Sequence, residues 1–104
     1  FHKLAKQTYD RIEAVFDAID PDEVECESAM DTLTFILPGG VKWIVSRQPP
    51  LRQLWLAVAS RGRAFHFDYD PATGHWLDDK GQVPELLTTL SQFLSEDAGL
   101  ELTF

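Results

Sequence analysis

The stretch from Phe1 to about Glu27 constrains the fold more than any other part of the chain. On a helical wheel of about 100° per residue, its apolar side chains form one stripe and its acidic side chains form a second, roughly opposite stripe. The apolar stripe consists of Ala5, Tyr9, Ile12, Phe16 and Ile19. This pattern predicts an amphipathic helix that ends near Asp20. Pro21 stops the helix, because the residue before a proline is pushed out of the α region.

The acidic stripe carries more negative charge than the helix needs. Like charges three or four residues apart destabilise a helix by roughly 0.2–0.5 kcal/mol per pair, which indicates that the acids serve something other than stability. Hard cations take oxygen ligands from such carboxylates. We name this set of candidate cation ligands the ridge; it consists of Asp10, Glu13, Asp17, Asp20, Asp22, Glu23 and Glu25, with Glu27 as a further candidate.

The charge balance excludes several classes of partner. The 104 residues include 9 basic and 17 acidic side chains, for a net charge of −8. Phosphate backbones and anionic membranes would repel such a chain, so we expect neither nucleic acid nor membrane as a partner. No apolar run approaches the length of a membrane span. The single Cys26 excludes an internal disulfide and fits a reducing compartment.

The rest of the chain alternates between strand patterns and turn signals, and then closes with a second helix. Pro38-Gly39-Gly40 marks a hairpin turn between two β-branched and aromatic runs. The predicted strands are Val24–Ser28, Asp31–Leu37, Val41–Arg47, Gln53–Val58, Ala64–Tyr69 and His75–Asp78, and the predicted second helix is Val83–Glu96. We therefore expect one domain over residues 1–104, of the α+β class, with two helices on one face of a largely antiparallel sheet of five or six strands.

The chain offers little for catalysis. It has no nucleophile elbow, no phosphate-binding glycine loop and no Glu-x-x-His pair for a di-iron centre. Cys26 alternates with surface acids and should point inward, where its thiolate is disfavoured. We therefore expect no enzymatic activity. A two-histidine zinc site in which His66 and His75 meet across neighbouring strands is a weaker alternative, and the role of His2 stays open.

Two surfaces are candidates for function. A helix face spreads its carboxylates, so the ridge should bind several cations weakly and exchangeably; the alternative is a solvated acidic face that only maintains solubility. On the strand Gln53–Val58, Leu54 and Leu56 should face the helices, which leaves Trp55 on the open sheet face as a protein-binding residue. Trp43 and Arg47 are candidates for that same face. The alternative is that Trp55 is buried.

The chain resembles the bacterial frataxin family, the CyaY type, over nearly its whole length. The features that carry the resemblance are the opening of the acidic helix, the strand around Cys26, the Arg-Gln and Gln-x-Trp-Leu-Ala motifs, and two later aromatic positions. In residues these are Phe1-His2-x-Leu4-Ala5, Val24-Glu25-Cys26-Glu27, Arg47-Gln48-x-Pro50-Leu51-x-Gln53-Leu54-Trp55-Leu56-Ala57, Phe65-His66-Phe67-Asp68 and Trp76. The short links between strands favour the bacterial branch over the mitochondrial one.

The resemblance implies a cytoplasmic, iron-binding regulator of iron–sulfur cluster assembly. It implies that the ridge binds Fe²⁺ or Fe³⁺, with other divalent cations as alternatives. It also implies that the protein docks on the cysteine desulfurase and the scaffold protein, usually as a brake in bacteria. The sheet-face contacts would be Arg47, Gln48, Gln53 and Trp55. We expect a monomer, with metal-dependent oligomerisation as an alternative. The other functions left open are an acidic interaction domain without a metal role, and iron storage or ferroxidase activity.

Two departures from the family pattern bear on these expectations. Ala14 and Ala18 follow Glu13 and Asp17, where many bacterial members carry adjacent acids, so the ridge should be sparser. The segment after the second helix, 99–104, is short. We expect it to cover little of the groove between the helices, and the protein therefore to have modest stability.

Overall fold

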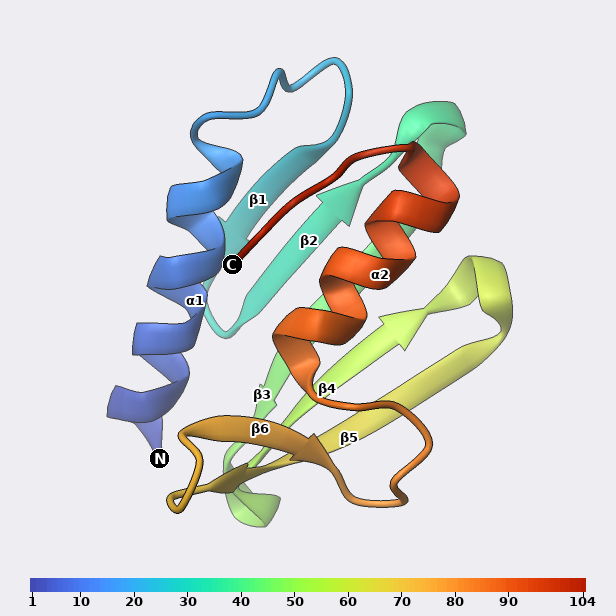
Figure 1. Ribbon diagram of the computed structural model, residues 1–104. Helices are drawn as coiled ribbons and strands as arrows, with labels where there is room; N and C mark the ends of the chain where they lie inside the picture. The colour runs from blue at the N-terminus through green and yellow to red at the C-terminus, as the bar shows by residue number, and fades with distance from the viewer.

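The computed structural model describes residues 1–104 and places two helices over one face of a six-stranded antiparallel sheet (Figure 1). The strands follow one another in chain order, β1 to β6, so every link between neighbours is short. The elements are α1 (His2–Phe16), β1 (Glu25–Ala29), β2 (Thr32–Ile36), η1 (Pro38–Gly40), β3 (Lys42–Gln48), η2 (Pro49–Leu51), β4 (Gln53–Val58), η3 (Ala59–Arg61), β5 (Arg63–Asp70), β6 (His75–Asp78) and α2 (Leu86–Ala98). This architecture confirms the predicted α+β class.

One hydrophobic core fills the space between the helices and the sheet. Twenty buried apolar residues form it, among them Trp43, Phe35 and Phe67 from the sheet. α1 contributes Ala5, Tyr9, Ile12 and Phe16, four of the five members of the apolar stripe. Ile19, the fifth member, is only partly buried and packs against the same core. Neither helix is both long enough and apolar enough to cross a lipid bilayer.

The first helix ends at Phe16, four residues earlier than the sequence predicted. Its last turn contains no basic residue, while the C-cap is the acidic Asp17. A negative charge is unfavourable at the carboxyl end of a helix dipole, so the acids work against further helix. The oxygen Asp20 Oδ1 then accepts a hydrogen bond from the backbone nitrogen of Asp22, at 2.9 Å, and holds the chain in a turn. The ridge is therefore part helix and part loop.

The second helix begins at Leu86, three residues later than predicted. Glu85 is the N-cap: its carboxylate accepts hydrogen bonds from the backbone nitrogens of Thr88, at 2.7 Å, and Leu87, at 3.0 Å. The cap satisfies donors that the first turn would otherwise leave unpaired. Pro84 precedes this cap and therefore lies outside the helix, although the predicted range Val83–Glu96 included it. At the other end, Gly99 ends the helix with a left-handed φ of 68°.

The register of β3 and β4 corrects one part of the sheet prediction. Trp43 pairs with Val58 and Arg47 pairs with Leu54, both of which are core-facing residues of β4. Because side chains alternate between faces, Trp43 and Arg47 lie on the helix side. Trp55 instead pairs with Ser46 and lies on the opposite side. We call this uncovered side of the sheet the open face.

The segment after α2 also differs from the prediction. It runs back between the two helices (Figure 1), and Leu100, Leu102 and Phe104 pack against the core. The Phe104 ring lies 6.1 Å from the Phe16 ring, and Arg11 donates a hydrogen bond to the carbonyl of Phe104 at 2.7 Å. The expectation that it covers little of the groove is therefore wrong. The reason is its alternating apolar residues, which can face the core along an extended chain.

Candidate functional site

The ridge follows the carboxyl-terminal half of α1, the loop after it and the start of β1. Its members on α1 and at the cap are Asp10, Glu13 and Asp17, while the others lie in the loop or on β1. Asp10 forms an ion pair with Lys6 at 2.7 Å, one helical turn away. None of the other ridge residues takes part in an ion pair. Most of the ridge charge is therefore uncompensated.

Three ridge acids share a groove with the cysteine. Glu13 and Asp17 from α1 and Glu25 from β1 line it together with Cys26, and its volume is about 440 Å³. The groove forms because β1 is an edge strand and α1 ends beside it. Glu27 belongs elsewhere: it pairs with Thr34 in the register of β1 and β2 and is exposed on the open face.

The pKa of the Cys26 thiol reflects the burial and the negative charge in this groove. Burial is the main cause that raises the pKa of Cys26 from 9.0 to about 11, and the charges of Glu13 and Asp17 raise it further. The side chain is half-buried against the core, as its pairing with the buried Phe35 requires. The inward orientation and the disfavoured thiolate that the sequence predicts for Cys26 are both confirmed.

The acids of the ridge do not converge on one point. No three histidine, cysteine, aspartate or glutamate side chains anywhere in the chain lie together in an arrangement that could hold a metal ion. The donors are carboxylate oxygens, which are ligands that hard cations prefer. Spread out along a surface, they can hold hydrated cations electrostatically, with water completing the coordination.

On the open face, the structure brings together three of the four predicted docking residues. Gln48 pairs with Gln53 across β3 and β4, and Trp55 lies two residues further along β4. The indole nitrogen of Trp55 donates to Gln53 Oε1 at 2.9 Å. Trp55 pairs with Ser46 on the side of the sheet that the helices leave uncovered, and it is half-buried rather than part of the core, so its predicted place on the open face is confirmed.

Arg47, the fourth, lies on the other side of the sheet. Its guanidinium carbon is 4.7 Å from the centre of the Tyr9 ring. Tyr9 in turn donates to the carbonyl of Asp31 at 2.8 Å and to that of Val45 at 3.3 Å. Burial raises the pKa of Tyr9 to about 12, although the nearby Arg47 opposes the shift. The position of Arg47 fits a role in fixing α1 on the sheet.

The histidines do not form the two-histidine site that the sequence left open. His66 pairs with Trp55, whereas His75 pairs with Asp70, four residues further along β5 and thus about 13 Å away. Each histidine faces a different carboxylate. The Nδ1 atom of His66 is 3.7 Å from Asp79, and that of His75 is 3.8 Å from Glu85.

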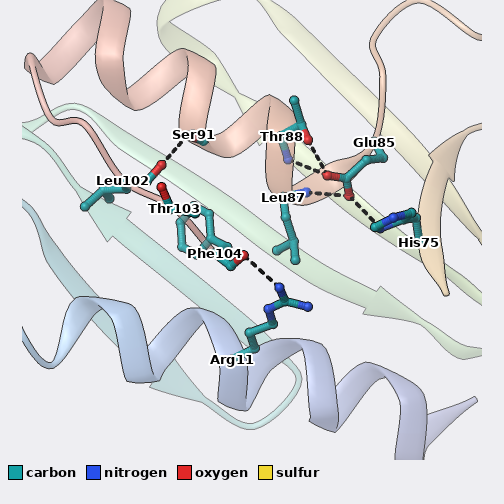
Figure 2. Close-up of a pocket in the computed structure, with 9 residues that line it drawn as sticks. All are labelled: Arg11, His75, Glu85, Leu87, Thr88, Ser91, Leu102, Thr103 and Phe104. Atoms are coloured by element: carbon teal, nitrogen blue, oxygen red, sulfur yellow. Dashed lines mark hydrogen bonds and ion pairs between the residues drawn. The ribbon is translucent and has the colours of Figure 1, made fainter. Parts of the chain in front are cut away.

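A second hollow, of about 300 Å³, lies between the helices (Figure 2). Its walls come from both helices, from β6 and from the chain end, with Arg11, His75 and Glu85 as the charged members. Figure 2 shows Arg11 reaching up to Phe104 and His75 turned toward the Glu85 cap. The charged groups are thus engaged with the protein itself, which makes the hollow part of the packing between tail and helices.

Sequence reasoning missed three residues beside Trp55. The His66 ring stacks on the Trp55 ring at 4.1 Å between centres and 17° between planes. Asp68 and Asp79 both accept hydrogen bonds from Gln53. The alternation of Phe65-His66-Phe67-Asp68 carried a signal, since buried phenylalanines place His66 and Asp68 on the open face. Asp79 lies in a loop, and no pattern could have placed it there.

Comparison with known proteins gives a consistent result. The model of the frataxin-like domain matches residues 1–100. The iron–sulfur cluster assembly protein CyaY of Pseudomonas fluorescens (strain Pf0-1) is 40% identical over 104 residues, which cover all of this chain and 91% of the relative. The protein of the same name from Pseudomonas syringae pv. syringae (strain B728a) is 47% identical over 105 residues, with the same coverage.

Solved structures agree with these relatives. Frataxin from Psychromonas ingrahamii superposes with a TM-score of 0.84 at 31% identity, covering 96% of this chain and 90% of the other. Yeast frataxin superposes with a TM-score of 0.70, covering 94% of this chain and 80% of the other, and at 19% identity it supports the fold alone. The match to the family model, the relatives and the shared fold together show that this chain belongs to the frataxin-like family.

Proposed function

We propose that this protein is a regulatory adaptor in iron–sulfur cluster assembly, which binds iron weakly on the ridge and docks on the cysteine desulfurase and its scaffold protein. The relatives named as iron–sulfur cluster assembly proteins support the pathway. The observation that carries the proposal is the uncompensated charge of the ridge, in which only Asp10 has a cationic partner. A surface of this kind attracts cations and basic protein surfaces alike.

Iron on the ridge is cargo rather than a resident cofactor. Carboxylate oxygens suit Fe²⁺ and Fe³⁺ but also Mn²⁺ and Ca²⁺, so selectivity is poor. Because the ligands are not gathered into one cluster, each ion keeps much of its water and exchanges readily. The chain therefore presents iron to a partner and does no chemistry on it. It acts as a non-enzymatic, monomeric protein of the bacterial cytoplasm.

Docking uses two surfaces that lie far apart. The ridge supplies long-range attraction for a basic partner, which speeds encounter and weakens with salt. The open face supplies Trp55, of the residue type most often found at the energetic centre of protein interfaces. β4 lies three strands from β1, or about 14 Å across the sheet, so one partner complex must span both surfaces or two components must divide them.

An anaerobic titration of Fe²⁺ into ¹⁵N-labelled protein tests the metal role. Amide resonances between Asp10 and Glu27 should broaden first, and the variant Glu13→Gln/Asp17→Asn should weaken that response. The variant Glu96→Gln/Glu101→Gln is a matched control, since it removes the same charge from α2 and the tail. If residues 10–27 stay unmoved while His66 and His75 respond, the ridge is not the iron site.

The two alternative functions, an acidic interaction domain and a ferroxidase, predict different results for the same protein and variants. An acidic interaction domain without a metal role would lose partner binding in Glu13→Gln/Asp17→Asn, yet respond to Fe²⁺ no more than an unrelated acidic protein does. A ferroxidase would consume oxygen faster than free Fe²⁺ in matched buffer. We expect no such acceleration, because neither helix carries a Glu-x-x-His pair.

A further inference from the structure

Two carboxylates on the open face share a single hydrogen-bond donor. The amide nitrogen of Gln53 donates to Asp68 Oδ1 at 3.1 Å and to Asp79 Oδ2 at 3.2 Å. The other end of the same amide, Gln53 Oε1, accepts from the Trp55 indole. These hydrogen bonds hold the side chains of Gln53 and Trp55 in fixed positions beside the two acids.

No arginine or lysine of the chain neutralises these two acids. Neither Asp68 nor Asp79 forms an ion pair with one, although Arg52 lines a hollow beside Asp68 and Lys80 follows Asp79. The ring of His66, which is charged only when protonated, lies 3.7 Å from Asp79. The side chain of Asp79 is 27% exposed, and Asp68 lies at the surface, so both carboxylates are accessible to a partner.

A stacked pair of aromatic rings borders the acids. The rings of Trp55 and His66 are stacked nearly in parallel, and both are half-buried. Because His66 lies 3.7 Å from Asp79, a cation bound to Asp79 lies beside this ring pair. Planar guanidinium groups stack on aromatic faces and meet carboxylates with two parallel hydrogen bonds, whereas an ammonium group is compact, strongly hydrated and cannot do both.

We propose that Gln53, Trp55, His66, Asp68 and Asp79, which we name the Trp55 cluster, form a receptor for an arginine side chain on the docking partner. The arginine lies along the stacked rings and donates to Asp68 and Asp79, which replace the hydration of its guanidinium. This inference rests on the proposed docking function and specifies the chemistry of one contact. The charge complementarity is local, because neither acid forms an ion pair with an arginine or lysine of its own chain.

A small-molecule titration tests the receptor without the partner. N-acetyl-L-arginine methylamide is added to ¹⁵N-labelled protein, and the Trp55 indole and Gln53 amide side-chain resonances are followed. We expect saturable shifts in the millimolar range, and binding of the lysine analogue at least about fivefold weaker. Equal shifts with both analogues, or none with arginine, would overturn the proposal.

Two variants locate the binding. Asp68→Asn/Asp79→Asn keeps oxygen acceptors for Gln53, so the fold should persist, and we expect arginine affinity to fall at least about tenfold. The control Glu96→Gln/Glu101→Gln removes the same net charge from α2 and the tail. If the control loses as much affinity as the cluster variant, the effect is one of net charge and the receptor is wrong.

Docking on the desulfurase–scaffold complex separates this inference from the proposed function. Asp68→Asn/Asp79→Asn should weaken docking at least about tenfold and reduce its salt dependence. If Trp55→Ala abolishes docking while the double asparagine variant binds like the parent, docking stands and the arginine receptor fails. If neither Trp55→Ala nor a ridge variant changes docking, the proposed function fails and this inference fails with it.

Discussion

The reactivity of Cys26 offers a direct measure of the electric field at the ridge. Disulfide exchange and alkylation proceed through the thiolate, so the rate follows the thiolate fraction. At pH 8 a thiol with a pKa of 9.0 is about one-tenth ionised, whereas a thiol with a pKa of about 11 is about one-thousandth ionised. The folded protein should therefore react about 100-fold more slowly at pH 8 than the same chain unfolded in urea.

The pH dependence separates electrostatics from simple obstruction. Alkylation by iodoacetamide, measured by mass spectrometry between pH 7 and 10, should rise with every pH unit without levelling off, because the pKa of Cys26 lies at about 11. Obstruction alone would slow the reaction but leave the curve levelling near pH 9. Levelling near pH 9 in the folded protein would refute the reasoning.

Variants of the ridge separate the contributions of burial and of negative charge to the raised pKa of Cys26. Burial is the larger cause, so Glu13→Gln/Asp17→Asn should lower the Cys26 pKa only part of the way from about 11 toward 9.0. Reactivity at pH 8 should rise in that variant and stay unchanged in Glu96→Gln/Glu101→Gln. An unchanged rate in both would mean that the carboxylates of Glu13 and Asp17 do not act on the groove.

The remaining predictions concern stability. Asp17→Asn should stabilise the protein by about 0.3–1 kcal/mol in thermal unfolding, because this acid caps the carboxyl end of α1. For the same reason, added salt should raise the melting temperature. A loss of stability in the variant would show that Asp17 is paired. Tyr9→Phe removes hydrogen bonds to two carbonyls and should cost about 0.5–1.5 kcal/mol in urea unfolding. Phe104→Ala should destabilise by about 1–3 kcal/mol through lost packing on Phe16, and no change would mean that the tail does not stabilise the groove.

Much of the fold could be read from short-range patterns. The strands Gln53–Val58 and His75–Asp78 appear with the predicted bounds, because alternating apolar residues between turn signals specify both length and face. The ends of both helices were misplaced. The charge of Asp17 ends the first helix and the cap by Glu85 begins the second. Each acts within a single turn, whereas hydrophobic periodicity is averaged over many residues and does not detect it.

The sites were predicted less completely than the fold. Trp55 was placed correctly because its neighbours Leu54 and Leu56 are uniformly aliphatic and must face the core. Arg47 was misplaced because its face depends on the register between β3 and β4, which only the pairing of strands decides. Asp79 joins Gln53 through a loop, so its role rests on tertiary structure alone.

The central claim is that two separate surfaces act together in docking. The most direct test is to measure binding of the desulfurase–scaffold complex to the immobilised protein. Trp55→Ala and Glu13→Gln/Asp17→Asn should each weaken binding, and the ridge variant should also reduce the salt dependence of the binding that remains. Because the surfaces lie about 14 Å apart, the losses in free energy should add in the combined variant within about 0.5 kcal/mol. Unchanged binding in Trp55→Ala or in Glu13→Gln/Asp17→Asn would contradict the claim that both surfaces act in docking.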